Sequence, residues 1–401
     1  MSNANEPVIV SAVRTAVGRA FRGTLRETRP DDLAAACMNA ALERAGGFDP
    51  ALVDDVILGC AMPEGPQGLN LARLALFRAG LPHHVPAVTV NRFCSSGLQT
   101  ISMAADRIAT GQAKAILAGG AESMSMVPMS GERFRPNPVL VDEMPEAYIS
   151  MGLTAEEVAS RFQVSRDEQD AFAFESHKRA VAALDSGAFK DEVVPVEVTF
   201  KAPGPRGESV VTTTTFDTDE GPRRDTSPEA LAKLKPAFKM GGTVTAGNSS
   251  QTSDGAAMAL VMSRARAEEL GLEILATLRG YQVAGVPPDI MGIGPVEAIP
   301  KVLKWCGVSQ DEVDLFEINE AFASQAAYCV RTLGIPPEKV NVHGGAIALG
   351  HPLGATGAKL TATLLHEMKR RGARYGVVSM CIGGGMGAAA LFERNGPELS
   401  R

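Results

Sequence analysis

The sequence predicts an α/β protein built from two similar halves, with a segment of loops and helices inserted between them. Short apolar runs alternate with helical patterns in both the first and the last third of the chain. In each half, a strand leads through a glycine-flanked turn into a helix. Because this alternation is typical of βαβ units, we expect a largely parallel sheet that is buried between helices.

The elements of the first half follow one another in a regular order. Each apolar run or helical pattern ends at a glycine, a proline or a change of period. The expected strands are residues 8–13, 53–59, 85–90 and 115–118, and the expected helices are one that opens at Asp31 and Asp32, residues 69–79, and one whose buried face carries Leu98, Ile101, Ala105 and Ile108.

From about residue 124 the composition changes to stretches rich in proline, glycine and charge, with one clear helix at residues 165–185. We expect loops and helices here rather than another sheet layer. The α/β pattern then returns, with strands expected at residues 314–318, 375–380 and 388–392 and helices at 320–333 and 358–371. We therefore divide the chain into a first half (1–123 and 251–273), an inserted segment (124–250) and a second half (274–401).

The composition excludes several classes of protein. Of the 401 residues, 45% are hydrophobic and 21% are charged, which is the balance of a folded protein rather than of a disordered chain. A net charge of −7 argues against a broad nucleic-acid-binding face. No apolar run reaches the roughly 18–20 residues that cross a bilayer, and no secretory signal is readable, so we expect a cytoplasmic protein with reduced thiols.

Two cysteines follow strands at places where chemistry could occur. Cys94, in VNRFCSSGLQTI, comes directly before a helix, and a helix N-terminus lowers the pKa of a thiol. Cys381, in VVSMCIGGGMG, ends a strand, and Gly383 and the two glycines after it leave backbone N–H groups free to bind an oxyanion. Either thiol could instead be an inert core cysteine, which is the common state of a free cysteine.

Two polar residues could join these cysteines. His351, in GGAIALGHPLGATG, precedes a proline, which favours extended backbone, so we expect its imidazole on a loop. It could also be a hydrogen-bonded structural histidine, and His343 is expected to be a loop residue outside the site. Asn319, in FEINEAFA, falls where a strand gives way to a helix. It could cap that helix, or its amide could fix a water or donate to a developing negative charge.

The other cysteines, at positions 37, 60, 306 and 329, fall within or at the ends of helical and strand patterns, and we expect them to be inert. The sequence contains neither a CxxC pair nor a cysteine–histidine ligand spacing. We therefore expect no metal site.

Taken together, the segments around Cys94, Asn319, His351 and Cys381 resemble the four motifs of the thiolase family, in the family's order, and the resemblance covers about residues 8–393. It implies two similar α/β halves packed as a five-layer α-β-α-β-α core with an inserted loop domain. It also implies thiolytic cleavage of a 3-ketoacyl-CoA by CoA, or the reverse Claisen condensation, through an acyl-cysteine. CoA is then a substrate, and no permanently bound cofactor is implied.

The resemblance also implies a role for each residue. Cys94 is the nucleophile, His351 accepts its proton, and Cys381 exchanges protons with the departing enolate and the incoming CoA. His351 and a water held by Asn319 face the enolate oxygen. The N–H groups of Cys94 and Gly383 face the tetrahedral oxyanion, where one such donor is worth on the order of 3 kcal/mol.

The family pattern places an arginine near the nucleotide of CoA and a serine and apolar residues near its pantetheine arm. Many short-chain biosynthetic members carry a histidine where this chain has Ser150. That departure favours a degradative 3-ketoacyl-CoA thiolase of broader chain length over a short-chain acetoacetyl-CoA thiolase. The residues expected to bind CoA are Arg223, Ser250, Met291, Ala321, Phe322 and Met151.

Two other readings stay open. A ketosynthase-like condensing enzyme shares the fold and a nucleophilic cysteine, but it typically has histidine or asparagine in the acid–base roles, so Cys381 argues against it. A CoA-ester or lipid-carrier binding protein would need no Cys94 nucleophile. For the assembly, the resemblance implies a homodimer or a homotetramer.

Overall fold

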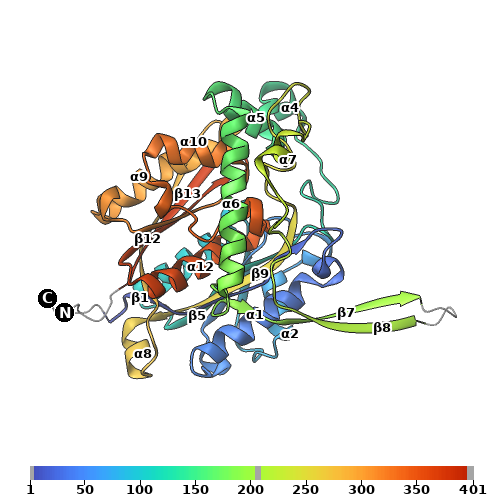
Figure 1. The fold of residues 1–401 in the computed structure, drawn as a ribbon. Helices are drawn as coiled ribbons and strands as arrows, with labels where there is room; N and C mark the ends of the chain where they lie inside the picture. Colours follow the sequence, from blue (N-terminus) through green and yellow to red (C-terminus); the bar gives the residue numbers. More distant parts are fainter. Residues whose placement is uncertain (1–3, 204–208, 395–401) are drawn as a thin grey trace.

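The computed structural model describes residues 4–203 and 209–394, which fold into a layered α/β body (Figure 1). Its main sheet has 11 strands in the order β11-β12-β13-β10-β1-β9-β5-β3-β4, with β2 beside β9 and β6 beside β1. The strands are β1 (Pro7–Thr15), β2 (Gly18–Arg19), β3 (Asp55–Gly59), β4 (Ala87–Val90), β5 (Ala115–Ser123), β6 (Val193–Val194), β9 (Ser253–Ser263), β10 (Ala276–Gly285), β11 (Leu315–Ile318), β12 (Tyr375–Ile382) and β13 (Met386–Glu393).

Three buried apolar clusters confirm the expected five layers. One cluster joins α1 and α2 to the outer face of the first-half strands. A second places α3 and α12 between the two halves of the sheet, and a third joins α9 and α10 to the outer face of the second-half strands. The helices of these layers are α1 (Pro30–Arg44), α2 (Leu71–Arg78), α3 (Ser96–Ala109), α9 (Gly294–Cys306), α10 (Ala323–Leu333) and α12 (Thr356–Arg371).

The expectation of a largely parallel sheet is wrong. Strand β9 lies between β1 and β5 and is antiparallel to both, and β13 is antiparallel to β10 and β12. Among the described strands, the parallel pairs are β3 with β4 and β5, β11 with β12, and β1 with β6. Helices bury both faces of these strands, and a strand buried on both faces is an unbroken apolar run whichever way it pairs.

The expected strands and helices are present, with ends that shift by a few residues. Strand β5 continues to Ser123 beyond the expected residue 118. Helix α10 begins at Ala323 rather than at residue 320. Among the described residues, no helix is long and apolar enough to cross a membrane.

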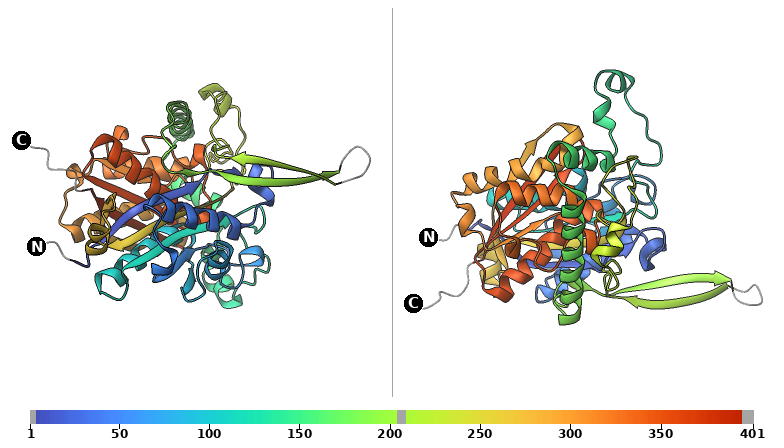
Figure 2. Two further views of the ribbon diagram at one scale, coloured as in Figure 1. Left: turned by 90° about the horizontal axis from the view of Figure 1, so that it is seen from below. Right: turned by 45° about the horizontal axis from the view of Figure 1, so that its top comes forward.

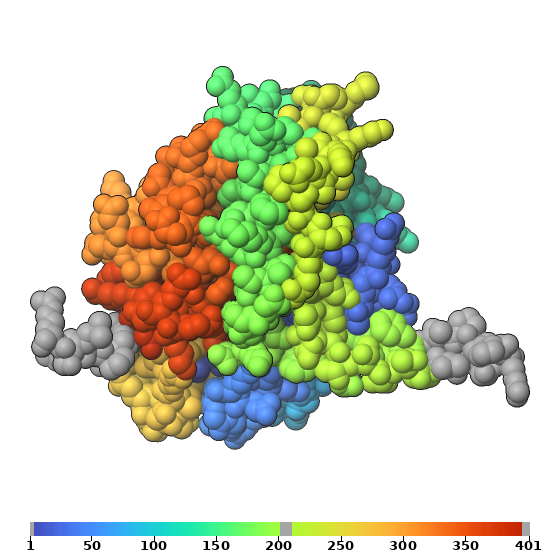
Figure 3. Space-filling view, viewed as in Figure 1, coloured from blue at the N-terminus to red at the C-terminus, as the bar shows by residue number. Residues whose placement is uncertain are grey.

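The inserted segment contains strands that the sequence analysis missed. Strands β7 (Val196–Pro203) and β8 (Ser209–Phe216) form an antiparallel ribbon that projects from the body (Figure 2). Helices α4 (Pro138–Glu143), α5 (Met151–Arg161), α6 (Arg166–Ser186) and α7 (Pro228–Ala232) make up the rest, with α8 (Arg264–Glu269) after β9. Helix α6 and the chain after β8 lie side by side over the body (Figure 3). The exact division of the chain into domains stays a prediction.

Candidate active site

Cys94 lies in a 3-10 turn, Phe93–Ser95, which leads directly into α3 as expected. Phe93 has a positive φ of 43°, a strained conformation for a residue with a side chain. Side-chain bonds hold the turn: the side chain of Asn91 accepts from the Phe93 N–H at 2.8 Å, and the Ser96 hydroxyl donates to the Phe93 carbonyl at 2.7 Å. The cysteine is thereby fixed at the start of the helix.

The expected lowering of the Cys94 pKa is wrong. Burial raises the pKa of the thiol to about 12, although the backbone N–H groups of Gly383 and of Cys94 itself act in the opposite direction. Desolvation of the thiolate outweighs these donors because the side chain is only 8% exposed. Cys94 is therefore a neutral thiol at neutral pH, and it needs a base when it attacks a carbonyl.

Cys381 is the next-to-last residue of β12, which ends directly before the glycine cluster. Burial raises the pKa of its thiol well above the ordinary value, and the charge of Cys94 acts in the same direction. The turn of Cys94 also contacts β12. The fold thus brings together two sulfurs that lie far apart in the sequence.

Gly383, which follows β12, contacts the turn that carries Cys94. Its N–H group reaches the Cys94 thiol, and a Cβ atom placed on it would lie 3.6 Å from Met151 Sδ and 3.8 Å from Phe93 Cδ2. This N–H and that of Cys94 are two donors aimed at one point, which is the arrangement that stabilises an oxyanion.

His351 lies on a loop, as expected, between the short helix α11 (Ala346–Leu349) and a 3-10 turn that begins at residue 353. Its Nε2 atom is 3.3 Å from Nδ2 of Asn319, and its Nδ1 atom is 2.6 Å from the hydroxyl of Thr356. Burial lowers the pKa of the imidazole to about 3, and the positive charge of Lys359 acts in the same direction. The ring is therefore neutral at neutral pH and able to accept a proton.

Asn319 does not cap the following helix, so that alternative is wrong. The residue before α10 is Phe322, and the backbone N–H of Asn319 instead donates to the Ser379 carbonyl on β12 at 2.9 Å. The buried Oδ1 atom of Asn319 has no hydrogen-bond partner among the residues that the structure describes. An unpaired buried acceptor is the feature expected of a side chain that binds a water or a substrate group.

Three residues that hold the site were missed by the sequence analysis. The Ser253 hydroxyl accepts from the backbone N–H of His351 at 3.1 Å, and Thr356 bonds the His351 ring. The buried carboxylate of Glu122 accepts from the Gly354 N–H at 2.8 Å. Thr356 belongs to the same motif as His351, which is a readable signal, whereas nothing in the sequence marks Ser253 or Glu122.

The residues expected to bind CoA fall into two neighbouring groups. Arg223 and Ser250 line a cavity of about 680 Å³, together with Phe238. The ring of Phe238 packs edge-on against that of Phe322, with centroids 5.8 Å apart. The other expected residues form an apolar cluster around Cys381 that contains Met151, Met291, Ala321 and Phe322.

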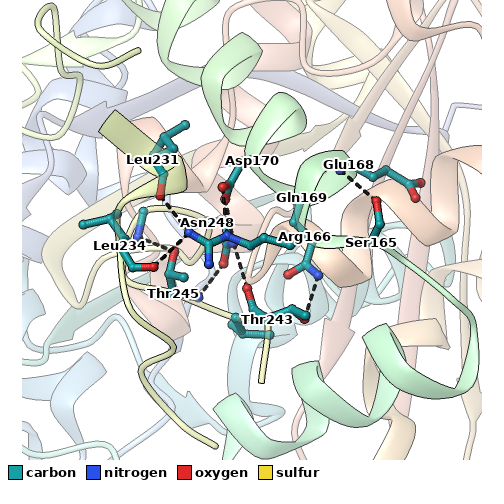
Figure 4. Close-up of polar contacts among 12 residues, drawn as sticks. Ser165, Arg166, Glu168, Gln169, Asp170, Leu231, Leu234, Thr243, Thr245 and Asn248 are labelled. Carbon is teal, nitrogen blue, oxygen red and sulfur yellow. Dashed lines mark hydrogen bonds and ion pairs between the residues drawn. The ribbon is translucent and has the colours of Figure 1, made fainter. Parts of the chain in front are cut away.

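A polar network in the inserted segment includes Asn248, the residue before Ser249 of the cavity lining (Figure 4). The Asn248 amide donates to the Asp170 carboxylate on α6 at 2.9 Å, and the Asn248 carbonyl accepts from the first N–H of α10 at 2.8 Å. Arg166, also on α6, donates to the carbonyls of Leu231 and Leu234. The inserted segment is thereby tied to the second half beside the site.

The remaining candidates lie elsewhere. His343 bonds Glu367 at 2.8 Å, outside the groups described above. Burial raises the pKa of both Cys37 and Cys329 to about 12, in line with the expectation that they are inert. Among the described residues, no group of three or more His, Cys, Asp or Glu side chains could hold a metal ion.

Sequence comparisons match the chain over nearly its whole length. Profiles described as "Thiolase, N-terminal domain" and "Thiolase, C-terminal domain" match residues 7–265 and 272–394. The chain is 58% identical to the 3-ketoacyl-CoA thiolase of Bacillus subtilis, covering 97% of this chain and 99% of the relative. It is 50% identical to the peroxisomal 3-ketoacyl-CoA thiolase of Homo sapiens, covering 98% and 92%.

Two solved structures share the fold. The dimeric peroxisomal thiolase of Saccharomyces cerevisiae superposes with a TM-score of 0.88 at 41% identity, covering 98% of this chain and 99% of that one. The acetyl-CoA acetyltransferase of Bacillus anthracis gives a TM-score of 0.86 at 43% identity, covering 97% and 98%.

Proposed function

Since the chain belongs to the thiolase family and is a 3-ketoacyl-CoA thiolase, an acetyl-CoA C-acyltransferase, we propose that Cys94 is its nucleophile and that His351 and Cys381 carry its protons. The observation that carries this proposal is the proximity of the two thiols, with the Gly383 N–H at the Cys94 thiol and a neutral imidazole on a neighbouring segment. The reaction is the thiolytic cleavage of a 3-ketoacyl-CoA by CoA, which is reversible.

In the first half-reaction, Cys94 Sγ attacks C3 of the substrate while its proton passes to His351 Nε2. The wide separation of their pKa values, about 12 and about 3, favours a transfer that accompanies the attack over a resting ion pair. The oxyanion accepts from the N–H groups of Cys94 and Gly383. When it collapses, the C2–C3 bond breaks, the acyl group stays on Cys94 as a thioester, and the acetyl-CoA enolate takes a proton from Cys381.

In the second half-reaction, the Cys381 thiolate removes the proton from the thiol of CoA. The CoA sulfur attacks the acyl-cysteine, and the second oxyanion again faces the N–H groups of Cys94 and Gly383. On collapse, the acyl group leaves on CoA, and the Cys94 thiolate recovers its proton from His351. The enolate of the first step faces the protonated His351 and a water at Asn319, whose unpaired Oδ1 supports this assignment.

We assign the CoA site to the 680 Å³ cavity and the apolar cluster beside it. Arg223 and Ser250 contact the nucleotide and the start of the pantetheine arm. Met291, Ala321, Phe322 and Met151 enclose the arm and lead it to the sulfurs.

We further propose a degradative enzyme of fatty-acid β-oxidation that accepts chains of different lengths. The name of the 58% identical relative and the presence of Ser150 support this subtype, whereas the 43% identical acetyltransferase supports the short-chain alternative. The test is a series of thiolysis rates with 3-ketoacyl-CoA substrates of increasing length. A broad optimum beyond four carbons supports the degradative subtype, and activity confined to acetoacetyl-CoA rejects it.

For the assembly, we propose a homodimer through the β4 edge of the main sheet, with pairing of dimers into a homotetramer as a second step. Strand β4 is an edge strand of the main sheet. An edge strand with free N–H and C=O groups and exposed apolar neighbours can pair with a strand of a second subunit. The exposed apolar residues near it are Leu69, Leu74, Phe77 and Val88. The mass in solution, measured by light scattering, tests this assembly. We also propose a cytoplasmic compartment, which the bacterial relative supports and the peroxisomal relatives do not.

A further inference from the structure

We propose that Thr356 is a positioning residue that holds His351 with its proton on Nδ1 and its lone pair on Nε2. This inference rests on the proposed role of His351 as the base. It concerns the step on which that role depends, because a nitrogen that already carries a proton cannot accept the one from Cys94.

A count of protons at the Thr356 hydroxyl carries the argument. Its Oγ1 atom lies 3.0 Å from the Pro352 carbonyl oxygen, to which it donates, and 2.6 Å from Nδ1 of His351. A hydroxyl has one proton, and a carbonyl oxygen can only accept. With the single proton of Thr356 donated to Pro352, Nδ1 is the donor to Oγ1.

The other side of the ring agrees. Nε2 lies 3.3 Å from Nδ2 of Asn319, which is an N–H donor, so the lone pair of Nε2 is the acceptor there. Both Thr356 and His351 are buried, with 0% and 5% exposure, so that bulk water does not compete for either nitrogen. Burial also holds the pKa of the ring near 3, so that it carries one proton rather than two.

The backbone around the ring is fixed by other residues, which isolates the contribution of Thr356. The Ser253 hydroxyl holds the His351 N–H, and Glu122 holds the Gly354 N–H. The hydrogen bonds of the ring itself go to Thr356 and Asn319. Within the described residues, Thr356 is the only hydrogen-bond partner of Nδ1. Removal of the Thr356 hydroxyl should therefore change the ring tautomer and leave the backbone of the loop in place.

Helix α12 offers a matched control. Thr361 is also buried and donates to the carbonyl four residues before it, Gly357, at 2.8 Å, and within the described residues it forms no hydrogen bond with His351. The variants T356V and T361V thus lose the same type of helical bond, and only T356V also loses the partner of Nδ1. The variant T356S keeps the hydroxyl.

The experiment measures the nitrogen chemical shifts of the histidine rings in uniformly ¹⁵N-histidine-labelled protein, with the His351 signals assigned by their absence in H351N. We expect the native enzyme and T361V to show a protonated Nδ1 and a bare Nε2, and T356V to show a mixture or the opposite tautomer. We expect kcat of T356V to fall roughly 10- to 100-fold, as activity does when the outer partner of a metal-binding histidine is removed, with KM for CoA unchanged. T356S should restore both the shifts and kcat.

Native-like ring shifts in T356V, or an equal loss of kcat in T361V, would overturn the inference. If T356V does not fold, T356A serves in its place with the same expected shifts. The proposed function fails separately: wild-type thiolysis by H351N would remove the base, whereas the tautomer measured in the native enzyme would still report on Thr356.

Discussion

The backbone N–H of Gly354 donates to the buried carboxylate of Glu122 across 2.8 Å, and this bond ties the loop that carries His351 to the first half of the chain. The same carboxylate accepts from the N–H of Ala61 at 2.7 Å and from the Gln67 amide at 2.8 Å. Ala61 packs in one apolar cluster with Cys94. The Glu122 side chain therefore fixes the segment that packs against Cys94 relative to the loop that carries His351.

Replacing Glu122 by Gln should separate these two loops. The glutamine amide presents an NH2 group in place of one of the two accepting oxygens, so at least one backbone donor loses its partner, at a cost of about 1.5–3 kcal/mol for a bond to a charged group. We expect E122Q to lower both the free energy of unfolding and kcat, with KM for CoA little changed. Steady-state kinetics and urea unfolding measure the two effects.

Glu156 provides the control for this prediction, because it is a second buried carboxylate that braces a loop. It accepts from the N–H groups of Thr243 and Val244, both at 2.9 Å, and Val244 packs in the apolar cluster assigned to the pantetheine arm, whereas Glu122 binds the loop of His351. E156Q should therefore destabilise the fold and raise KM more than it lowers kcat. Equal falls in kcat in the two variants would contradict a specific role for Glu122.

The two active-site thiols should fail at different steps. C94A has no nucleophile and should show no thiolysis. C381S should still acylate Cys94 but turn over slowly, because a hydroxyl is a much weaker acid than a thiol and gives its proton to the enolate poorly. Intact-protein mass after mixing with a 3-ketoacyl-CoA detects the acyl group, and CoA-dependent turnover gives the rate.

C306S, a change at the end of α9 away from the site, is the control. Wild-type turnover in either active-site variant would contradict the assignment.

Local chemistry was readable from the sequence, and tertiary contacts were not. The strand end before Cys381, the helix start after Cys94 and the proline after His351 are short-range features, and each predicted the local structure correctly. The pKa of Cys94 was predicted in the wrong direction because burial, which comes from the packing of distant segments, dominates it. The antiparallel pairing of β9 was not predicted for the same reason. A strand that is buried on both faces has the same apolar sequence pattern whether it pairs parallel or antiparallel.

The bond between Ser253 and the His351 N–H shows the same limit at the site. Serine is a common surface residue, and its role here exists only because β9 is placed beside the His351 loop. The projecting ribbon of β7 and β8 was missed because its proline- and glycine-rich surroundings resemble a loop.

The depressed pKa of His351 should make the protein less stable in acid. The folded ring titrates near pH 3 and the unfolded ring near its ordinary value of about 6.5, so below pH 6.5 the unfolded chain binds a proton that the folded chain does not. This part of the stability is present above pH 6.5 and is lost as the pH falls towards 3. Between pH 7 and pH 5 the loss amounts to about 2 kcal/mol.

H351N should therefore lose about 2 kcal/mol less unfolding free energy than the native protein over that interval. His177, whose pKa burial lowers to about 4, contributes a loss of the same sign to both proteins and so cancels in the comparison. Urea unfolding at the two pH values measures the difference, with H83Q, a change at an exposed histidine, as the control. Identical losses in H351N and the native protein would show that the ring is not buried in its neutral form.

Arg223 and Arg224 are adjacent in sequence but face different surroundings, and this contrast tests the proposed CoA site. Arg223 lines the 680 Å³ cavity, and its guanidinium forms no ion pair with the described residues, so that it is free to bind a phosphate. Arg224 instead pairs with Asp185 on the surface.

We expect R223A to raise KM for CoA about tenfold, the equivalent of about 1.4 kcal/mol, because one charge-assisted bond is lost at an exposed position. We expect R224A to leave KM unchanged, since an exposed pair contributes little to the fold and nothing to the cavity. Because neither arginine contacts the thiols, kcat at saturating CoA should stay at the native value in both variants. An unchanged KM in R223A, or an equal rise in both variants, would place the nucleotide of CoA elsewhere on the protein.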